Sequence, residues 1–154
     1  MTSPLPPQKH SKGQRQALDT LWLTHLTEGG DPGEGDQLAN SPSFGIGIAE
    51  FNQGKFFEAH ESFESAWLDA PYPDCLLGLA LAKLGAACAN GQRGNLASAT
   101  KIVGDTLRYL APLPMVFAGL DCSALRDGLE LWTKSPHDQE LLIQLVRVIT
   151  TMSD

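Results

Sequence analysis

One segment limits the fold of this chain more than any other. Between Pro73 and Gly91 the sequence includes LLGLALAKLGAACA, in which Lys83 is the only charged residue. A helix from Pro73 or Asp74 to Asn90 would be apolar on nearly every side, so other elements have to surround it. The apolar stretch is too short to span a bilayer. The segment therefore predicts the central helix of a water-soluble helical bundle.

Proline, glycine and capping residues divide the rest of the chain into further helices. Ser41 followed by Pro42 is typical of a helix start, and Gly54 and Pro71 are typical of helix ends. The expected helices cover about residues 14–27, 42–52, 55–70, 95–110, 121–134 and 137–152. No useful stretch alternates with period two, so no sheet is expected. The predicted fold is all-α: a single-domain bundle of about six helices over 14–154, with a central helical hairpin, after a mobile tail at 1–13.

Composition narrows the classes of function. Lys and Arg number 11 against 18 Asp and Glu, which gives a net charge of −7. An acidic surface repels phosphate backbones and anionic lipids, so we expect neither nucleic acid nor a membrane as a partner. The three cysteines fit neither a disulfide framework nor a CxxC metal site, and no signal peptide is expected. A cytoplasmic protein with reduced, buried thiols is predicted, and apolar residues of the last helix would suit a homodimer.

The segment Phe51–Trp67, FNQGKFFEAHESFESAW, carries the most distinctive pattern. On a helical wheel advancing about 100° per residue, its large apolar side chains gather on one face that should contact the core. These are Phe56, Phe57, Phe63, Trp67 and Leu68. His60 and Glu64 fall inside this face, and Glu61 falls on its rim. The solvent side is expected to hold Glu58, Ser62 and Ser65.

A histidine and a carboxylate inside an apolar face require partners, because a buried unpaired charge is costly. Their i, i+4 spacing places them one helical turn apart. They could form a structural polar network, supply two ligands to a divalent metal, or act as an acid–base pair in which a glutamate orients His60. Binding of a small ligand, whose identity the sequence does not specify, is a fourth alternative. The HExxH signature of zinc proteases is not met, since Glu64 stands at its second histidine.

At these residues the chain resembles the family known as domain of unknown function 309. Members of this family are small all-helical proteins that are labelled predicted metal-dependent hydrolases. The residues that fit the family's first block are Phe51, Asn52, Gly54, Phe56, Phe57, Glu58, Ala59, His60, Glu61, Glu64 and Trp67. Its second block is matched by Arg93, Gly94 and Asn95. The likeness covers about residues 43–110. It implies an all-helical fold and a hydrolase in which a divalent metal is held by His60, Glu61 and Glu64, the same residues being catalytic.

Other residues of the two blocks have their own candidate roles. Lys83 stands where the family pattern has glutamine, and Asn90 where it has histidine. We expect Lys83 to bring a positive charge towards His60, which favours an ion-paired polar core over a metal site. Asn52 is expected to take a left-handed backbone or to cap the next helix. Arg93 and Asn95 should close the junction between two helices; with Asn52 and Lys83 they are the candidate ligand-binding residues.

Overall fold

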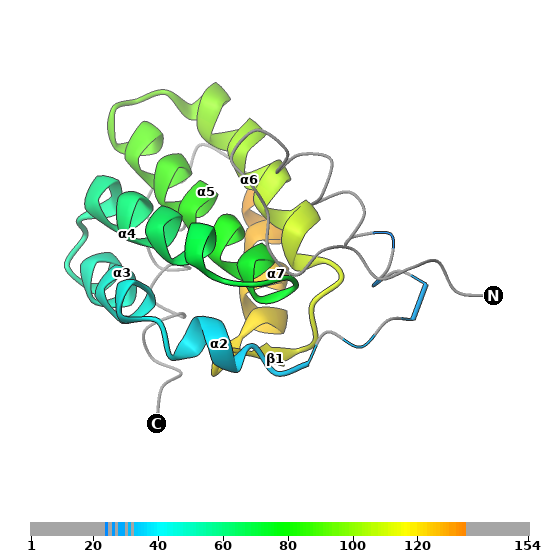
Figure 1. Cartoon of the computed structure of the whole chain (residues 1–154). Coiled ribbons are helices and arrows are strands. Elements are labelled where there is room, and N and C mark those ends of the chain that lie inside the picture. Colours follow the sequence, from blue (N-terminus) through cyan, green and yellow to red (C-terminus); the bar gives the residue numbers. More distant parts are fainter. Residues whose placement is uncertain (1–23, 25, 27, 30, 32, 135–154) are drawn as a thin grey trace.

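The computed structural model of the protein describes residues 24, 26, 28, 29, 31 and 33–134 (Figure 1). Its elements in chain order are α2 (Asp36–Ala39), α3 (Pro42–Asn52), α4 (Phe56–Asp69), α5 (Asp74–Gln92), α6 (Leu96–Leu110), β1 (Val116–Phe117), β2 (Leu120–Asp121) and α7 (Cys122–Thr133). The fold is all-helical apart from one short hairpin, which confirms the predicted class. The expected tail at 1–13 and the expected helix at 137–152, with its dimer surface, lie outside the described residues, as does most of the helix at 14–27.

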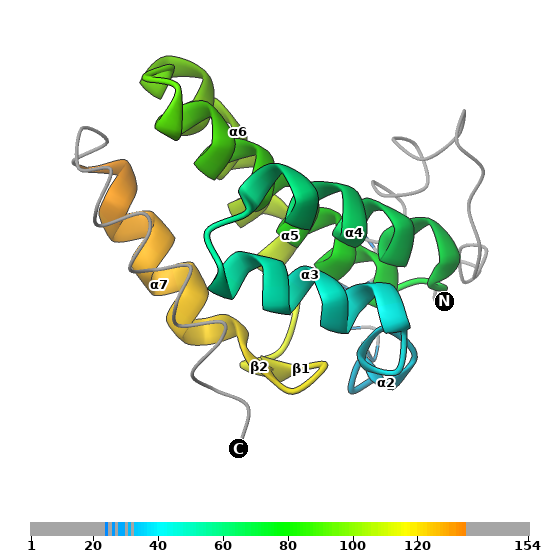
Figure 2. The ribbon, with the colours of Figure 1, turned by 90° about the vertical axis from the view of Figure 1, so that its left-hand side faces the viewer.

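Helix α5 is the centre of the described fold, as its apolar sequence predicts. Most of its residues are buried. Helices α4 and α6 pack along its two sides (Figure 1), and α3 packs against α4 (Figure 2). Each helix in the series α3, α4, α5 and α6 therefore contacts the helix that follows it in the sequence. Each of the pairs α3–α4 and α5–α6 is an antiparallel hairpin closed by a short turn.

The two hairpin turns have nearly the same backbone conformation. Gly54 in the first and Gly94 in the second take positive φ angles of 75° and 84°. The next residue, Lys55 or Asn95, donates its backbone N–H across the turn at 2.9 Å, to the carbonyl five residues earlier. Both glycines permit a left-handed conformation that L side chains rarely adopt. The helix end predicted at Gly54 is therefore confirmed.

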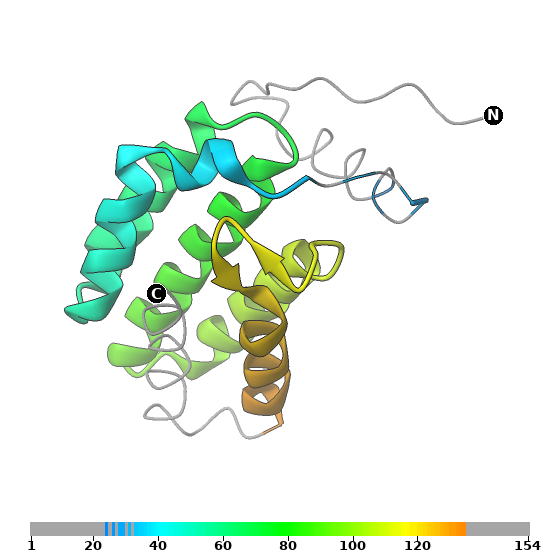
Figure 3. The same cartoon turned by 90° about the horizontal axis from the view of Figure 1, so that it is seen from below.

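The absence of any sheet is one prediction that the structure overturns. Strands β1 and β2 pair antiparallel, with Val116 opposite Asp121 and Phe117 opposite Leu120. Each strand is only two residues long, too short for an alternating pattern to be visible in the sequence. The hairpin leads directly into α7, which packs along α6 (Figure 3). Residues 36–39, which lie outside the predicted helices, also form a single helical turn, α2.

Side chains of α7 and α5 complete the ends of other helices. Arg126 Nη1 donates to the carbonyl oxygens of Leu110 and Leu113 at 3.0 Å and of Ala111 at 3.3 Å, so it binds the C-terminal end of α6. Cationic groups are favourable at that end of a helix. Asp74 Oδ2 accepts from the backbone N–H of Leu38 at 3.0 Å, inside α2. Because α5 and α6 are antiparallel, both contacts lie at the same end of that hairpin, opposite its turn.

Two further findings concern the environment of the protein. None of the helices in the described part of the chain is long and apolar enough to cross a membrane. All three cysteines, Cys75, Cys88 and Cys122, are buried and form no disulfide within the described residues, as predicted. Burial raises the pKa of Cys88, and it raises the pKa of Cys122 to about 11. Both thiols are therefore protonated and unreactive at neutral pH.

Candidate functional site

Helix α4, which carries the distinctive motif, turns a different face to the core than the wheel predicts. Phe56, Phe63 and Trp67 are buried as expected. The rest of the contact surface comes from Ala59 and Ala66, which are also buried. Phe57 and Leu68, expected in the core, are 53 % and 38 % exposed. Helix α4 lies between α3 and α5 and buries its alanines along with the large apolar side chains, so the core-facing side is rotated away from Glu64.

Glycines on the neighbouring helices let α4 lie close to both of them. A Cβ atom added to Gly47 of α3 would lie 2.7 Å from the ring of Phe63. One added to Gly85 of α5 would lie 3.1 Å from the backbone nitrogen of His60 and the carbonyl oxygen of Phe56. The second contact brings the backbones of α4 and α5 together at His60. Because Gly85 has no side chain, the backbone of α4 at His60 can lie this close to α5.

His60 is half-buried at the edge of α4 that faces α5. Its Nδ1 lies 2.7 Å from the carbonyl oxygen of Ala82 in α5. Because a carbonyl oxygen only accepts hydrogen bonds, Nδ1 carries the ring proton and donates it. The other ring nitrogen, Nε2, lies 3.4 Å from Glu64 Oε2, with 30 % and 38 % of the two side chains exposed. The pair predicted from the i, i+4 spacing is thus present, at the edge of the core and open to solvent.

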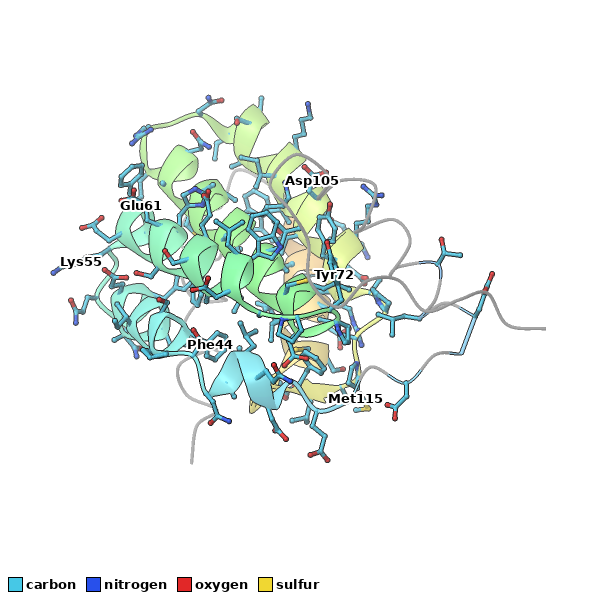
Figure 4. The ribbon with its side chains drawn as sticks, in the orientation of Figure 1. Phe44, Lys55, Glu61, Tyr72, Asp105 and Met115 are labelled. Carbon is cyan, nitrogen blue, oxygen red and sulfur yellow. The ribbon has the colours of Figure 1, made fainter. Side chains whose placement is uncertain are left out.

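The described residues do not assemble a metal site. Among them, no group of three or more His, Cys, Asp or Glu side chains is placed to hold a metal ion. Glu61 is exposed on the outer side of α4 (Figure 4). His60 and Glu64 together offer two ligands, with the imidazole orientation fixed by the bond from Nδ1. A complete catalytic centre within one chain does not fit these residues, since such sites usually hold three protein ligands.

The four candidate binding residues do not converge on His60. Lys83 extends to α6 instead, with its Nζ 3.9 Å from Asp105 Oδ2 and 6.0 Å from the ring centre of Tyr109. The expectation that Lys83 brings its charge to His60 is therefore wrong. It fails because the carbonyl of Ala82, one residue earlier, occupies the side of α5 that faces His60.

The remaining three candidates lie at helix ends. Asn52 is exposed and lies within α3, and Gly54 takes the left-handed conformation instead. Helix α4 also has no side-chain cap. Both roles expected for Asn52 are therefore wrong. Asn95 caps α6 by accepting from Ser98 N at 3.2 Å, as expected of an N-cap. Arg93 is the exposed C-cap residue of α5. These contacts are structural, and within the described residues they leave no shared ligand site.

A polar contact on the opposite edge of α4 was missed from the sequence. Ser62 Oγ donates to Glu50 Oε1 at 2.5 Å and so joins α4 to α3. Ser62 was expected to meet solvent, but it is half-buried. Together with the bond from His60 to Ala82, this contact fixes both edges of α4. A carboxylate at Glu50, twelve residues away on another helix, gives no local signal in the sequence.

The described part of the chain is therefore an all-helical bundle whose motif helix is held between two neighbours and presents a half-exposed histidine–glutamate pair. The family whose description reads "Domain of unknown function (DUF309)" matches residues 44–102, from the first turn of α3 into α6. This confirms the resemblance drawn from the two sequence blocks. No curated protein and no solved structure matches the chain.

Proposed function

We propose that the chain is a non-catalytic helical interaction module, in which His60 and Glu64 hold α4 in place and its outer side is left for a partner. The observation that carries the proposal is the bond from His60 Nδ1 to the Ala82 carbonyl, at 2.7 Å. It uses the histidine to join two helices. The exposed side of α4 includes Phe57 and Leu68, and exposed apolar side chains are enriched where proteins bind one another.

Denaturant unfolding of His60 variants tests the structural part of the proposal. His60→Ala should lower the free energy of unfolding by about 1 kcal/mol, the net value of one hydrogen bond. His60→Asn should retain most of that stability, because the asparagine amide nitrogen can stand at the position of Nδ1. Glu61→Ala is the matched control on the exposed side, with an expected change within about 0.5 kcal/mol. A His60→Ala protein as stable as the wild type would contradict the proposal.

A metal-dependent hydrolase is the second candidate, with His60, Glu61 and Glu64 as metal-binding and catalytic residues. One observation favours it: Nδ1 is anchored, so Nε2 is oriented towards Glu64 and solvent, as in histidines that ligate metals. The missing ligands would have to come from outside the described residues. Hydrolysis of p-nitrophenyl esters and phosphates, measured with zinc, manganese or nickel, tests this candidate. Activity that disappears in His60→Asn would support it; activity equal to that of His60→Asn would exclude it.

The proposed setting of this module is the cytoplasm. Three buried cysteines that form no disulfide are suited to a reducing compartment. The net charge of −7 argues against nucleic acid and anionic membranes as partners. We propose another protein surface, including a second copy of this chain, as the class of partner. Fractionation of the native host and co-purification from its cytosol would test this placement; recovery of the chain with membranes or bound to nucleic acid would contradict it.

A further inference from the structure

We infer that the outer side of α4 binds a basic amphipathic helix of another protein. The inference rests on the proposed function and names the chemistry of the partner. It begins from four side chains that follow one another at spacings of four, three and four residues: Phe57, Glu61, Glu64 and Leu68. These spacings place the four side chains in one line along the helix. We name this line the outer ridge of α4.

The two ends of the outer ridge are apolar and accessible. Phe57 and Leu68 are both exposed, and the carboxylates of the ridge lie between them. The two residues are separated by a rise of about 16 Å along the helix axis, which a partner helix of about three to four turns spans. Aromatic side chains are enriched where proteins bind one another, because their burial there is favourable. The outer ridge therefore offers an apolar contact at each end.

The outer side of α3 continues this surface. The two helices lie side by side on one side of the bundle (Figure 2). Glu50 Oε1 accepts a hydrogen bond from Ser62 Oγ, so the side of α3 that carries Glu50 adjoins α4. Ile46 lies one turn before Glu50, on that same side, and is exposed. Three of the six large apolar side chains that are exposed in the described part of the chain therefore belong to this hairpin: Ile46, Phe57 and Leu68.

The distribution of charge indicates which kind of partner fits. Residues 42–69, which include α3 and α4, contain five carboxylates and one basic residue, Lys55. Residues 74–110, which include α5 and α6, contain two carboxylates and four basic residues. Negative charge is therefore concentrated on the α3–α4 side of the bundle and is not spread over its whole surface. A charged surface attracts and orients partners of opposite charge, so this side favours a partner rich in lysine or arginine.

The charge of α4 argues against a second copy of this chain meeting the same ridge. Helix α4 has no Lys or Arg and contains four carboxylates: Glu58, Glu61, Glu64 and Asp69. Two copies in contact through this side would place like charges opposite each other, which opposes association. A helix with apolar residues on one face and cations along its flanks meets both parts of the ridge, because its spacing repeats that of α4.

Fluorescence anisotropy with the full chain and a labelled synthetic peptide tests the inference. The peptide is a helix of about 15 residues, which is about four turns, with leucine on one face, lysine along both flanks and glutamine on the back. It should bind the chain, and its affinity should fall as salt is added. A matched peptide with glutamate in place of each lysine should not bind. A lysine peptide with serine in place of each leucine should bind at least about tenfold more weakly.

Variants of the chain locate the binding surface. Phe57→Ser and Leu68→Ser should each weaken binding about tenfold, the loss of one buried apolar contact. Leu131→Ser removes an exposed apolar side chain from α7 and should leave the affinity unchanged. Glu61→Gln should weaken binding about threefold at low salt and less at high salt, because ions screen an exposed ion pair. Its matched control is Glu130→Gln, which removes an exposed carboxylate from α7.

Four results would overturn the inference. They are no binding of the lysine peptide, equal binding of the glutamate peptide, and equal losses in Phe57→Ser and Leu131→Ser. The fourth is self-association of the chain in sedimentation equilibrium that Phe57→Ser abolishes, since a second copy would then occupy the ridge.

Stability measurements separate this inference from the proposed function. Phe57→Ser and Glu61→Gln leave the bond from His60 to Ala82 intact, so both should unfold at the same denaturant concentration as the wild type. If the peptide does not bind while His60→Ala is destabilised, the partner is the part that is wrong. If the peptide binds while His60→Ala is as stable as the wild type, the structural role of His60 is the part that fails.

Discussion

The α3–α4 hairpin and the α5–α6 hairpin have the same turn but are packed by different means. In the first, the rings of Phe44, Phe51 and Phe63 meet between the helices, with ring centres 5.2 Å apart for Phe51 and Phe63 and 5.9 Å apart for Phe44 and Phe63. Gly47 lies directly against Phe63. In the second, Gly104 of α6 is exposed, and a Cβ atom added to it would meet no atom within 4 Å. The turn is therefore a local property, whereas the helix spacing depends on which side chains lie between the helices.

The largest expected difference between the hairpins is in their glycines. Gly47→Ala should lower the free energy of unfolding by about 1–3 kcal/mol, because its Cβ would overlap the buried ring of Phe63. Gly45→Ala on the same helix and Gly104→Ala on α6 meet no atoms and should raise it by up to about 1 kcal/mol, the helix propensity of alanine over glycine. Chemical denaturation measures all three. A stable Gly47→Ala protein would show that Phe63 does not set the spacing.

The two turn glycines should respond alike. Gly54→Ala and Gly94→Ala should each cost about 1–2 kcal/mol, since a side chain is strained at positive φ, and neither added Cβ has a neighbour within 4 Å. Equal losses in the two variants, compared by denaturant titration, would confirm that strain alone is responsible. Losses that differ by more than about 1 kcal/mol would mean that the turns are not equivalent.

The residue after each glycine should distinguish the hairpins by a smaller amount. Asn95 caps α6 through its side chain, whereas Lys55 provides no side-chain cap to α4. Asn95→Ala should lower the free energy of unfolding by about 1 kcal/mol. Lys55→Asn should raise it by at most about 1 kcal/mol. Thermal unfolding followed by circular dichroism checks both. If Lys55→Asn destabilises the protein, an asparagine at this position does not cap α4 as Asn95 caps α6, although the two turns have similar backbone angles.

The connection between the hairpins gives a pH-dependent prediction. Burial raises the pKa of the Asp74 carboxyl above its ordinary value of 3.8, despite the bond from Leu38 N. The folded state therefore keeps this proton over a pH range in which the unfolded state has lost it. Asp74's contribution to stability falls as the pH rises from near 3.8 through the raised pKa. Asp74→Asn keeps an acceptor oxygen without a titrating proton, so its stability relative to the wild type should increase across this range. Parallel stability curves for the two proteins would refute this.

Much of the helical framework could be predicted because its signals are local. The Ser41-Pro42 start, Gly54, Pro71 and the Asn95 cap act on the residues beside them. The central place of α5 also followed, since a helix that is apolar on all sides has to be covered. The strands β1 and β2 could not be predicted, because two residues are too few to show an alternating pattern.

The sequence predicted which residues pair at the candidate site, but not which way helix α4 faces. The pairing of His60 with Glu64 follows from helical spacing. The predicted orientation of α4 was wrong because the wheel counted large apolar residues, whereas the buried side also includes Ala59 and Ala66. The partner of His60 is the backbone carbonyl of Ala82, and a backbone atom gives no residue-specific signal. Lys83 was placed wrongly for the same reason.

The hairpin β1–β2 returns to the start of the described bundle, and this has a kinetic consequence. Ala118 donates its backbone N–H to the carbonyl of Glu34 at 2.8 Å. The main packing from α3 to α6 joins helices that are adjacent in sequence, which requires only short loops to close and favours rapid assembly. The contact between Ala118 and Glu34 closes a far longer loop, whose entropy cost is greater. We therefore expect the helices to assemble in sequence order during refolding, and the attachment of β1–β2 to Glu34 to come last.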